Sequence, residues 1–302
     1  FIVDIREEFG DWVIDRFVGD YLDGRTPNPC VLCNTHIKWA ALLKRADNLG
    51  CDFIATGHYA RVREENNRFV ISRGLDPKKD QSYALWGVAQ KHLARTIFPL
   101  GNYPKTEIRQ IAEDHGLLNV ANKPDSYEIC FVPDDDYRRF LKDKVSGLEE
   151  RVKGGKFVDK NGIILGVHEG YPFYTIGQRR GLNLPMGKPV YVTHIDAKTN
   201  TITVGEKEEL ISSTLIAREI NLLKYDRVPT SEMEVTGAIR YNDDGAIGHL
   251  TQTGDDEIKV HFPAGRDAIT PGQAIVCYEG DDVVAGGWIK KVNVGFDELI
   301  DS

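Results

Sequence analysis

The sequence lacks any apolar run of the roughly 18 residues that a membrane-spanning helix needs. No signal peptide precedes the fold, so we expect a protein without a membrane partner. The chain also begins at Phe1 rather than at Met. We therefore expect that an N-terminal segment of the natural protein is missing from these 302 residues.

Cysteine is scarce, and the number of cysteines is odd. Five cysteines in a chain of this length do not form a disulfide framework, which indicates a reducing, cytoplasmic location. The net charge of -8 argues against a broadly basic nucleic-acid-binding surface but permits a local one. One local candidate is Gly177-Gln-Arg-Arg-Gly181, whose arginines either contact a polyanion or lie on an ordinary solvated surface.

What the sequence does contain is a Cys-x-x-Cys pair, Cys30 and Cys33, with a lone Cys130 far downstream. Asn34 is a good N-cap for the helical apolar periodicity over residues 36–49, which Gly50 can end. This pattern predicts that Cys33 borders a helix N-terminus, where partial positive charge favours a thiolate. A thiolate at this position indicates sulfur chemistry.

The Cys-x-x-Cys pair is also compatible with three roles that need no sulfur transfer. A zinc site normally needs four ligands, and the chain has no second Cys-x-x-Cys and no His-x3-His. A thioredoxin-like redox pair would follow a strand, whereas residues 11–21 have helical periodicity. Two buried, inert cysteines are the third possibility.

Three regions are expected along the chain. Residues 1–141 alternate a strand (51–56) with helices (82–93 and 105–115), which indicates an α/β domain with ligands at the carboxyl ends of its strands, where Gly57 and His58 fall. Residues 142–210 are rich in Gly, Lys and β-branched residues and are expected to form a small β-rich domain. Residues 211–302 contain short alternating segments between Gly/Asp turns, which predict a small closed β-barrel.

Six motifs in this order resemble the tRNA-specific 2-thiouridylases of the MnmA (TrmU) type. The resemblance covers nearly the whole chain. The motifs are Gly24-Arg-Thr-Pro-Asn-Pro-Cys-Val-Leu-Cys-Asn34 with Ile37-Lys38, Ala55-Thr-Gly-His-Tyr-Ala60, Lys79-Asp-Gln-Ser82, Ile129-Cys-Phe131, Tyr174-Thr-Ile-Gly-Gln-Arg-Arg-Gly-Leu182 and Thr270-Pro-Gly-Gln273.

The resemblance implies a PP-loop ATP-pyrophosphatase domain of the adenine-nucleotide-hydrolase type, here incomplete, followed by a small central domain and a C-terminal β-barrel. The implied reaction replaces the C2 oxygen of the wobble uridine of tRNA by sulfur. ATP and Mg2+ would be the cofactors. The partners would be tRNA, whose base would flip out of its stack, and a persulfide sulfur donor such as a cysteine desulfurase or a relay protein.

The resemblance also assigns roles to residues. Cys130 would carry the persulfide, and Cys33 would be the nucleophile that leaves a Cys33 to Cys130 disulfide. Gly57 would contact ATP. The target base would meet Asn28, Pro29 and Cys30. The remaining tRNA contacts would be His58, Lys79, Asp80, Gln81, Arg240, Tyr241 and Gln273.

Two departures from the family pattern stand out. Many members have Asp where this chain has Cys30, so Cys30 could compete with Cys33 as the resolving thiol. The Ser-Gly-Gly-x-Asp-Ser PP-loop is absent, so we expect these 302 residues alone to be inactive in adenylation. The alternative functions are a non-catalytic tRNA-binding protein and a sulfur relay; a tRNA methyltransferase would need a methyl-donor motif that we do not find.

Overall fold

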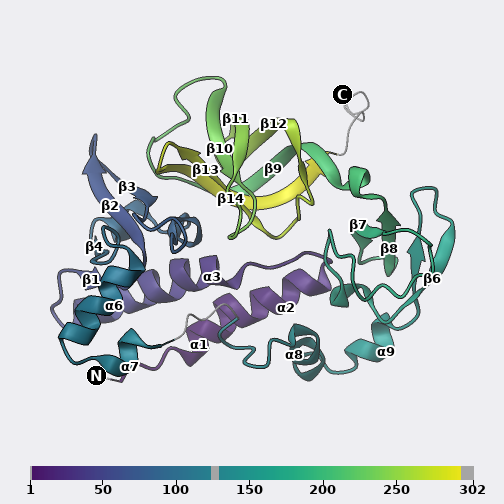
Figure 1. Ribbon diagram of the computed structural model, residues 1–302, viewed down its shortest axis with the longest axis horizontal. Coiled ribbons are helices and arrows are strands. Elements are labelled where there is room, and N and C mark those ends of the chain that lie inside the picture. The colour runs from purple at the N-terminus through teal and green to yellow at the C-terminus, as the bar shows by residue number, and fades with distance from the viewer. Residues whose placement is uncertain (1, 124–128, 294–302) are drawn as a thin grey trace.

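The computed structural model describes residues 2–123 and 129–293. Residues 294–302 of the predicted barrel region lie outside the described residues. Figure 1 shows a layer of helices along one side, a barrel above its middle and a smaller β-rich part at one end. None of the helices described is both long and apolar enough to cross a membrane.

Two long helical stretches lie side by side beneath the barrel (Figure 1). The first confirms the helix expected over residues 11–21 and is built from α1 (Arg6–Phe9), η1 (Gly10–Ile14) and α2 (Asp15–Leu22). The second is built from α3 (Pro29–Leu32), η2 (Cys33–Ala41) and α4 (Leu42–Asn48). In both stretches the η segment has the wider π-helical hydrogen bonding.

The second stretch confirms a helix that ends near Gly50, whose φ is +68°. The expected start was wrong, because the helix already begins at Pro29, with Asn28 as the residue before it. The ring of a proline at the first helical position presets φ, and its missing N–H is not needed there.

The rest of the first region consists of short elements. β1 (Ile54–Ala55) pairs in parallel with β4 (Thr96–Ile97), which confirms a parallel arrangement but shortens the strand expected over residues 51–56. α6 (Lys105–Asp114) confirms the predicted helix before Gly116, and α7 (Leu118–Ala121) follows.

The single helix expected over residues 82–93 was wrong. The chain forms η3 (Ser82–Leu85), turns, and continues as α5 (Gln90–Leu93). At the turn Gly87 lies so close to η2 that a Cβ on it would be 2.3 Å from the Thr35 hydroxyl. This packing against η2 accounts for the interruption.

The central part contains a sheet with strand order β6-β5-β8-β7. Its hydrophobic core also takes in Phe17 and Tyr21 of α2, so this core reaches into the helical layer. Helix α8 includes residue 141, where the sequence analysis divides the first region from the second. The exact domain bounds stay a prediction. The elements are α8 (Tyr137–Lys144), α9 (Leu148–Val152), β5 (Gly155–Val158), β6 (Ile164–His168), η4 (Tyr171–Phe173), β7 (Tyr191–Asp196), β8 (Thr201–Gly205) and η5 (Lys207–Leu210).

The barrel predicted for the last region is confirmed. Its strands run in the order β13-β10-β11-β12-β9-β14, and pairing of β13 with β14 closes the barrel. Alternate residues of β12 such as Ile258, Val260 and Phe262 are buried in its core. The strands are β9 (Ile211–Leu222), β10 (Met233–Ala238), β11 (Ala246–Gly254), β12 (Glu257–Asp267), β13 (Ala274–Glu279) and β14 (Asp282–Asn293).

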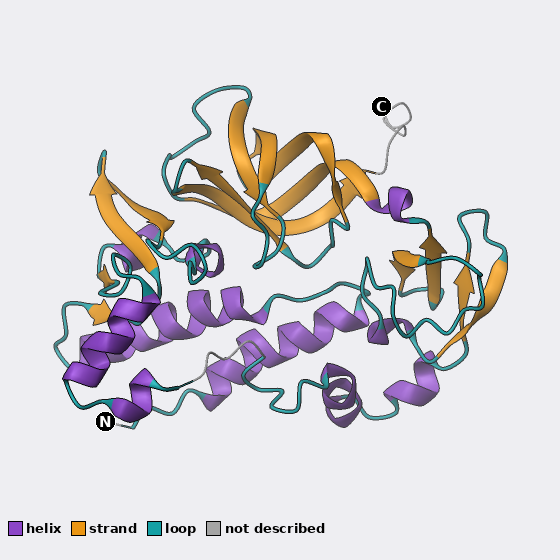
Figure 2. Cartoon of the chain, viewed as in Figure 1, coloured by secondary structure: helices purple, strands orange, loops and turns teal. Residues whose placement is uncertain are grey.

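A hairpin of the first region extends the barrel sheet. β2 (Ala60–Glu65) and β3 (Arg68–Arg73) are joined through Asn66 and Asn67, which adopt the positive φ that a tight hairpin turn needs. Asp282 of β14 pairs with Ser72 of β3, and Figure 2 shows the hairpin standing beside the barrel. The barrel is therefore anchored on the first region.

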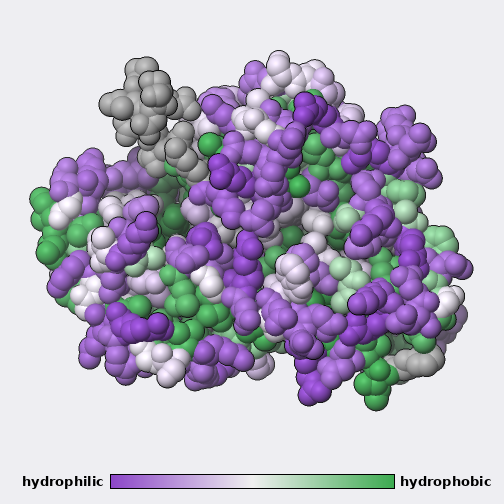
Figure 3. All heavy atoms as spheres, turned by 180° about the vertical axis from the view of Figure 1, so that it is seen from behind, coloured by the Kyte–Doolittle hydropathy of each residue, from purple (hydrophilic) through white to green (hydrophobic). Residues whose placement is uncertain are grey.

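The surface mixes polar and apolar side chains. On the face drawn in Figure 3, hydrophilic side chains predominate, and hydrophobic atoms gather in smaller groups between them. Arg179 and Arg180 are both exposed, with Gly177 and Gly181 at positive φ on either side of the pair.

Candidate functional site

Three cysteines from two distant parts of the sequence interact electrostatically at the second helical stretch. Cys30 and Cys130 are exposed, Cys33 is half-buried, and all three are free thiols. A charge on Cys130 acts on the titration of both Cys30 and Cys33, so the three thiols lie within electrostatic reach of one another. Cys33 and Cys130 are thus close enough for the charge of one to act on the other, while their pairing in a reaction stays a prediction.

The electrostatics of Cys33 differ from our expectation. Cys33 lies in the second turn of the helix, because the helix begins at Pro29, and the positive end of the dipole is nearer to Cys30. Desolvation by the surrounding protein raises the pKa of Cys33, the Lys38 ammonium opposes this, and Cys130 adds to it. Burial therefore outweighs the Lys38 charge and raises the pKa of Cys33, which is opposite to the lowering that we expected from the helix N-terminus.

Cys30 has a similar environment although it is exposed. Protein atoms around it desolvate the thiol and raise its pKa, while Lys38 again acts in the opposite direction. Lys38 is therefore the cation shared by both thiols. The sequence analysis quoted Lys38 only as part of a motif; its spacing of five residues from Cys33 matches the π-helical turn of η2.

Lys38 is held in place by His58. Its Nζ lies 3.3 Å from His58 Nε2, while His58 Nδ1 lies 2.8 Å from Thr56 Oγ1. An ammonium can only donate, so Nε2 accepts and Nδ1 carries the proton that is donated to Thr56. Burial, followed by the Lys38 charge, lowers the pKa of His58 to about 3, so the ring is neutral near pH 7.

Cys130 is positioned by its neighbour in the sequence. The Phe131 ring makes edge or tilted contacts with three other rings, at centroid distances of 5.7 Å from Phe9, 5.2 Å from Phe17 and 5.4 Å from Phe140. Phe9 and Phe17 belong to the first helical stretch and Phe140 to α8. This aromatic cluster anchors the Cys130 segment against the helical layer.

Gly57 lies where the sequence analysis placed it, just beyond the carboxyl end of β1. It is exposed, and a Cβ there would meet only Leu100 Cδ1, at 3.6 Å. The backbone at Gly57 is thus open to close approach, which fits contact with a nucleotide.

Two residues of the Lys79-Asp-Gln-Ser82 motif are used internally. Asp80 accepts hydrogen bonds from the backbone N–H groups of Gly74 (2.9 Å) and Ser82 (3.1 Å). Gln81 Oε1 accepts one from the backbone of Tyr59 at 3.0 Å. Lys79 is half-buried. Asp80 and Gln81 therefore shape the loop, and their direct contact with tRNA stays a prediction.

The three candidate tRNA contacts in the barrel differ in how accessible their side chains are to a ligand. Arg240 is exposed, and no described residue pairs with its guanidinium. Tyr241 is 47% exposed, with its hydroxyl 3.3 Å from the Asp80 carbonyl oxygen. The side-chain amide of Gln273 is bonded to the segment before Cys30, at Thr26 and Pro27. Arg240 and Tyr241 can meet a ligand directly, whereas both amide hydrogens of Gln273 are already in use.

Asn28 and Pro29 frame the start of the cysteine helix. Pro29 is buried, and the Asn28 side chain is half-buried and acts to lower the pKa of Tyr83, whose phenol burial keeps protonated. Tyr83 is a further residue of this site that the sequence patterns did not single out. Within residues 2–123 and 129–293, no three His, Cys, Asp or Glu side chains are grouped so that they could hold a metal ion.

Comparison with known proteins identifies the three parts of the chain. Residues 1–134 match the profile described as "tRNA methyl transferase HUP domain", residues 139–206 match the "tRNA methyl transferase PRC-barrel domain", and residues 212–289 match the "Aminomethyltransferase beta-barrel domain". A protein of Salinibacter ruber named tRNA-specific 2-thiouridylase MnmA is 64% identical over 97% of this chain and 76% of its own length.

The chain belongs to the MnmA family of tRNA-specific 2-thiouridylases. Members from Cytophaga hutchinsonii and Amoebophilus asiaticus are 57% and 56% identical over 96% of the chain, and they are covered over 79% and 77% of their own lengths. Family and fold class are thus as the motifs predicted. The relatives are named thiouridylases although two profile descriptions contain the words methyl transferase.

Proposed function

We propose that this protein is a tRNA 2-thiouridylase that transfers sulfur from a cysteine persulfide to C2 of the wobble uridine. The observation that supports this most directly is that Cys130 lies within electrostatic reach of both Cys33 and the exposed Cys30. Family membership supports tRNA as the substrate and ATP as the co-substrate. ATP would convert the C2 oxygen into a phosphoester that can leave, with Mg2+ as counter-ion of its phosphates.

The cysteines would act in sequence. A persulfide donor loads a sulfur atom onto Cys130, and the terminal sulfur attacks the activated C2 while the oxygen leaves with AMP. Cys33 Sγ then attacks Cys130 Sγ, which breaks the bond to the transferred sulfur and releases 2-thiouridine. The product is a Cys33 to Cys130 disulfide, which an external dithiol reduces to the two free thiols seen in the structure.

Lys38 would support this step electrostatically. Attack requires Cys33 to lose its proton in an environment that raises its pKa, and Lys38 is the nearby group that opposes this rise. Lys38 also opposes the rise in the pKa of Cys30, and Cys30 is more exposed than Cys33. Cys30 is therefore the alternative resolving thiol. Mapping the disulfide that accumulates without a reductant would distinguish Cys33 from Cys30.

Further contacts belong to the proposal. Gly57 would receive ATP, and Asn28, Pro29 and Cys30 would face the target base. tRNA would contact Arg240 through phosphate and Tyr241 through stacking, with Lys79 nearby. His58, Asp80, Gln81 and Gln273 would also contact tRNA, from loops that their hydrogen bonds within the protein hold in place. A cytoplasmic location is part of the proposal, because exposed free thiols persist in reducing compartments.

The test is mass spectrometry of tRNA after incubation of the full-length protein with ATP, Mg2+ and a persulfide donor. Full-length protein is needed because the 302 residues contain no Ser-Gly-Gly-x-Asp-Ser loop. Cys130→Ser and Cys33→Ser should each abolish 2-thiouridine while tRNA binding persists. Cys51→Ser, an exposed cysteine outside the cluster, is the matched control. Normal thiolation by either cluster variant would refute the assignment, and a persulfide on Cys130 without any 2-thiouridine in the presence of ATP would favour a simple relay.

A further inference from the structure

Cys30 lies one helical turn before Cys33. Both belong to the helical stretch that begins at Pro29, with Cys30 inside α3 and Cys33 directly after it at a helical φ of -58° and ψ of -45°. Side chains three residues apart on a helix are neighbours on one face. In agreement with this, the charge of Cys30 acts on the titration of Cys33. Both thiols are free in the structure, but they have the spacing that a Cys-x-x-Cys bridge uses.

The first turn of this helix can tighten to admit such a bridge. A disulfide needs Cβ atoms roughly 3.5 to 4.5 Å apart, whereas residues three apart on an α-helix have theirs about 5 to 6 Å apart. The backbone N–H of Cys33 is hydrogen-bonded to the carbonyl oxygens of both Pro29 and Cys30. The bond to Cys30 is the one that a 3-10 turn uses, and in a 3-10 turn residues i and i+3 eclipse. A small tightening of a turn that is already shared between the two forms therefore brings the two sulfurs together.

The three thiols differ in their surroundings. Cys33 is half-buried and packs against the hydrophobic core that also contacts Phe131, the residue after Cys130. Cys30 and Cys130 are both exposed. A bridge that passes from Cys130 to Cys30 leaves Cys33 in its place against the core. Cys130 then becomes a free, exposed thiol, which is the state that it needs to receive the next persulfide.

The local charges favour Cys30 as a nucleophile once Cys33 and Cys130 are joined. Burial raises the pKa of Cys30, the Lys38 charge lowers it, and the charge of Cys130 raises it again. A sulfur in a disulfide carries no charge, so the influence of Cys130 disappears at this stage while that of Lys38 remains. The pKa of Cys30 is therefore lower in the disulfide form than in the form with three free thiols, and more of Cys30 is present as the attacking thiolate.

We propose that Cys30 is a third catalytic cysteine, which resolves the Cys33 to Cys130 disulfide by thiol–disulfide exchange. This inference rests on the proposed sulfur transfer, because that reaction forms the disulfide. The Cys30 thiol loses its proton to water, and its Sγ attacks Cys33 Sγ. The bond between Cys33 and Cys130 breaks, and its electron pair leaves with Cys130 Sγ, which takes up a proton.

The exchange completes the cycle without conflict with the other role of Cys30. The thiolated base has already been released when the disulfide forms, so contact of Cys30 with the target base precedes its attack on Cys33. The product is a Cys30 to Cys33 bridge. An external dithiol reduces this bridge by giving up two electrons and becoming a disulfide itself. The Cys33 to Cys130 disulfide is thus an intermediate, and the exposed Cys-x-x-Cys pair is the site of reduction.

The experiment maps disulfides after one turnover of the full-length protein with ATP, Mg2+, tRNA and a persulfide donor, and without a dithiol. The reaction is stopped in acid, free thiols are blocked with N-ethylmaleimide, and the protein is cut with trypsin. Residues 26–38 form one tryptic peptide that contains both Cys30 and Cys33, while Cys130 lies in another. A Cys30 to Cys33 bridge removes two hydrogen atoms from one peptide, whereas any bridge to Cys130 joins two peptides.

Two variants are compared with the unmodified protein. Cys30→Ser removes the attacking thiol and should accumulate the Cys33 to Cys130 cross-link. Cys51→Ser is the matched control, since Cys51 is exposed but outside the cluster, and it should behave like the unmodified protein, in which the bridged 26–38 peptide predominates. Thermal unfolding of each variant checks that the fold persists. A cross-link to Cys130 as the main product in the unmodified protein would overturn the inference.

A second arm separates this inference from the proposed function. The tRNA-free protein is equilibrated in a buffer of reduced and oxidised glutathione and is mapped in the same way. The Cys30 to Cys33 bridge should again predominate, and the Cys33 to Cys130 cross-link should appear only in Cys30→Ser; predominance of any other form in the unmodified protein counts against the exchange. If no 2-thiouridine is made in the first arm, the proposed function fails, and the glutathione arm still decides whether Cys30 takes the bridge.

Discussion

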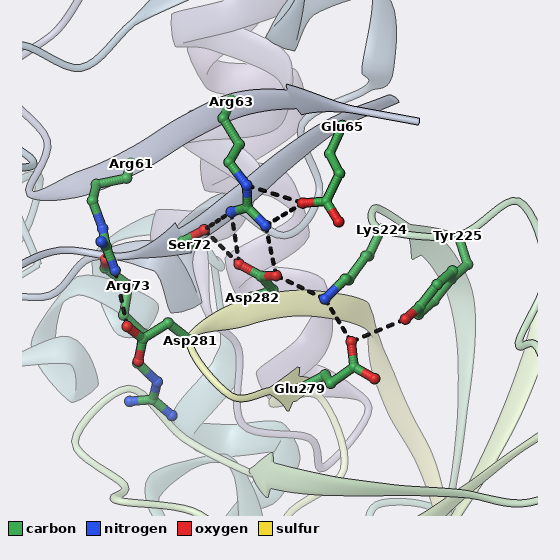
Figure 4. A network of polar contacts seen from close by, with 10 residues as sticks. All are labelled: Arg61, Arg63, Glu65, Ser72, Arg73, Lys224, Tyr225, Glu279, Asp281 and Asp282. Carbon is green, nitrogen blue, oxygen red and sulfur yellow. Dashed lines mark hydrogen bonds and ion pairs between the residues drawn. The ribbon is translucent and has the colours of Figure 1, made fainter. Parts of the chain in front are cut away.

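Asp282 is the residue whose replacement should most weaken the attachment of the hairpin to the barrel. Its carboxylate accepts two hydrogen bonds from Arg63, both at 2.8 Å, one from Lys224 at 2.8 Å and one from Ser72 at 2.7 Å (Figure 4). The side chain is only 13% exposed, so water does little to screen these charges. We expect Asp282→Asn to lower the free energy of unfolding.

The loss of unfolding free energy in Asp282→Asn depends on which carboxylates remain paired with Arg63 and Lys224. Arg63 keeps the carboxylate of Glu65, and Lys224 keeps that of Glu279. Neither cation is left without a partner, so the cost should lie below the roughly 3 to 5 kcal/mol of a broken buried pair. It should exceed the roughly 0 to 1 kcal/mol of an exposed pair. We expect about 2 kcal/mol, between these two limits.

The loss should also depend on pH. The hydrogen bonds from Arg63, with those from Lys224 and Ser72, hold the pKa of Asp282 well below its usual range. A carboxylate with a depressed pKa stabilises the fold above its unfolded pKa of about 3.9 and loses that contribution as pH falls further. The difference between the unmodified protein and Asp282→Asn should therefore be full at pH 7 and shrink below about pH 4.

Calorimetry can measure this effect. A loss of about 2 kcal/mol corresponds to roughly 4 to 8 °C in the melting temperature of a unit of 150 to 250 residues. Asp281→Asn is the matched control, since Asp281 is 65% exposed and pairs with Arg61 alone among the described residues. Equal shifts for the two variants at pH 7, or a difference that persists unchanged in acid, would refute this reasoning.

Three further predictions concern the site. Lys38→Met should raise the pKa of Cys33 and slow its alkylation several-fold near pH 7 but not at high pH, with Lys38→Arg restoring most of the rate; an unchanged pH profile would contradict this. His58 should stay neutral down to about pH 5 in imidazole nitrogen NMR because burial lowers its pKa to about 3, and a titration near pH 6.5 would show that its ring is exposed. Arg240→Ala should weaken tRNA affinity and reduce its salt dependence through loss of one phosphate contact, and an unchanged salt slope would remove Arg240 from the interface.

Some errors of the sequence analysis have local causes. The helix start was placed too late because Asn34 is a good N-cap, whereas Pro29 fits the first helical position and extends the helix through both cysteines. The helix expected over residues 82–93 is interrupted where Gly87 packs on Thr35. Local periodicity contains no information about such a packing partner.

The sequence by itself determined the family, the order of the three parts and the location of the main helices and barrel strands. These depend on motif order and hydrophobic periodicity, which are properties of the chain itself. Only the tertiary structure decided that Cys130 lies within electrostatic reach of Cys33, that His58 is buried against Lys38, and that Gln273 is hydrogen-bonded to the segment before Cys30. Each of these depends on the burial and hydrogen bonding of residues far apart in the sequence, which no local pattern specifies.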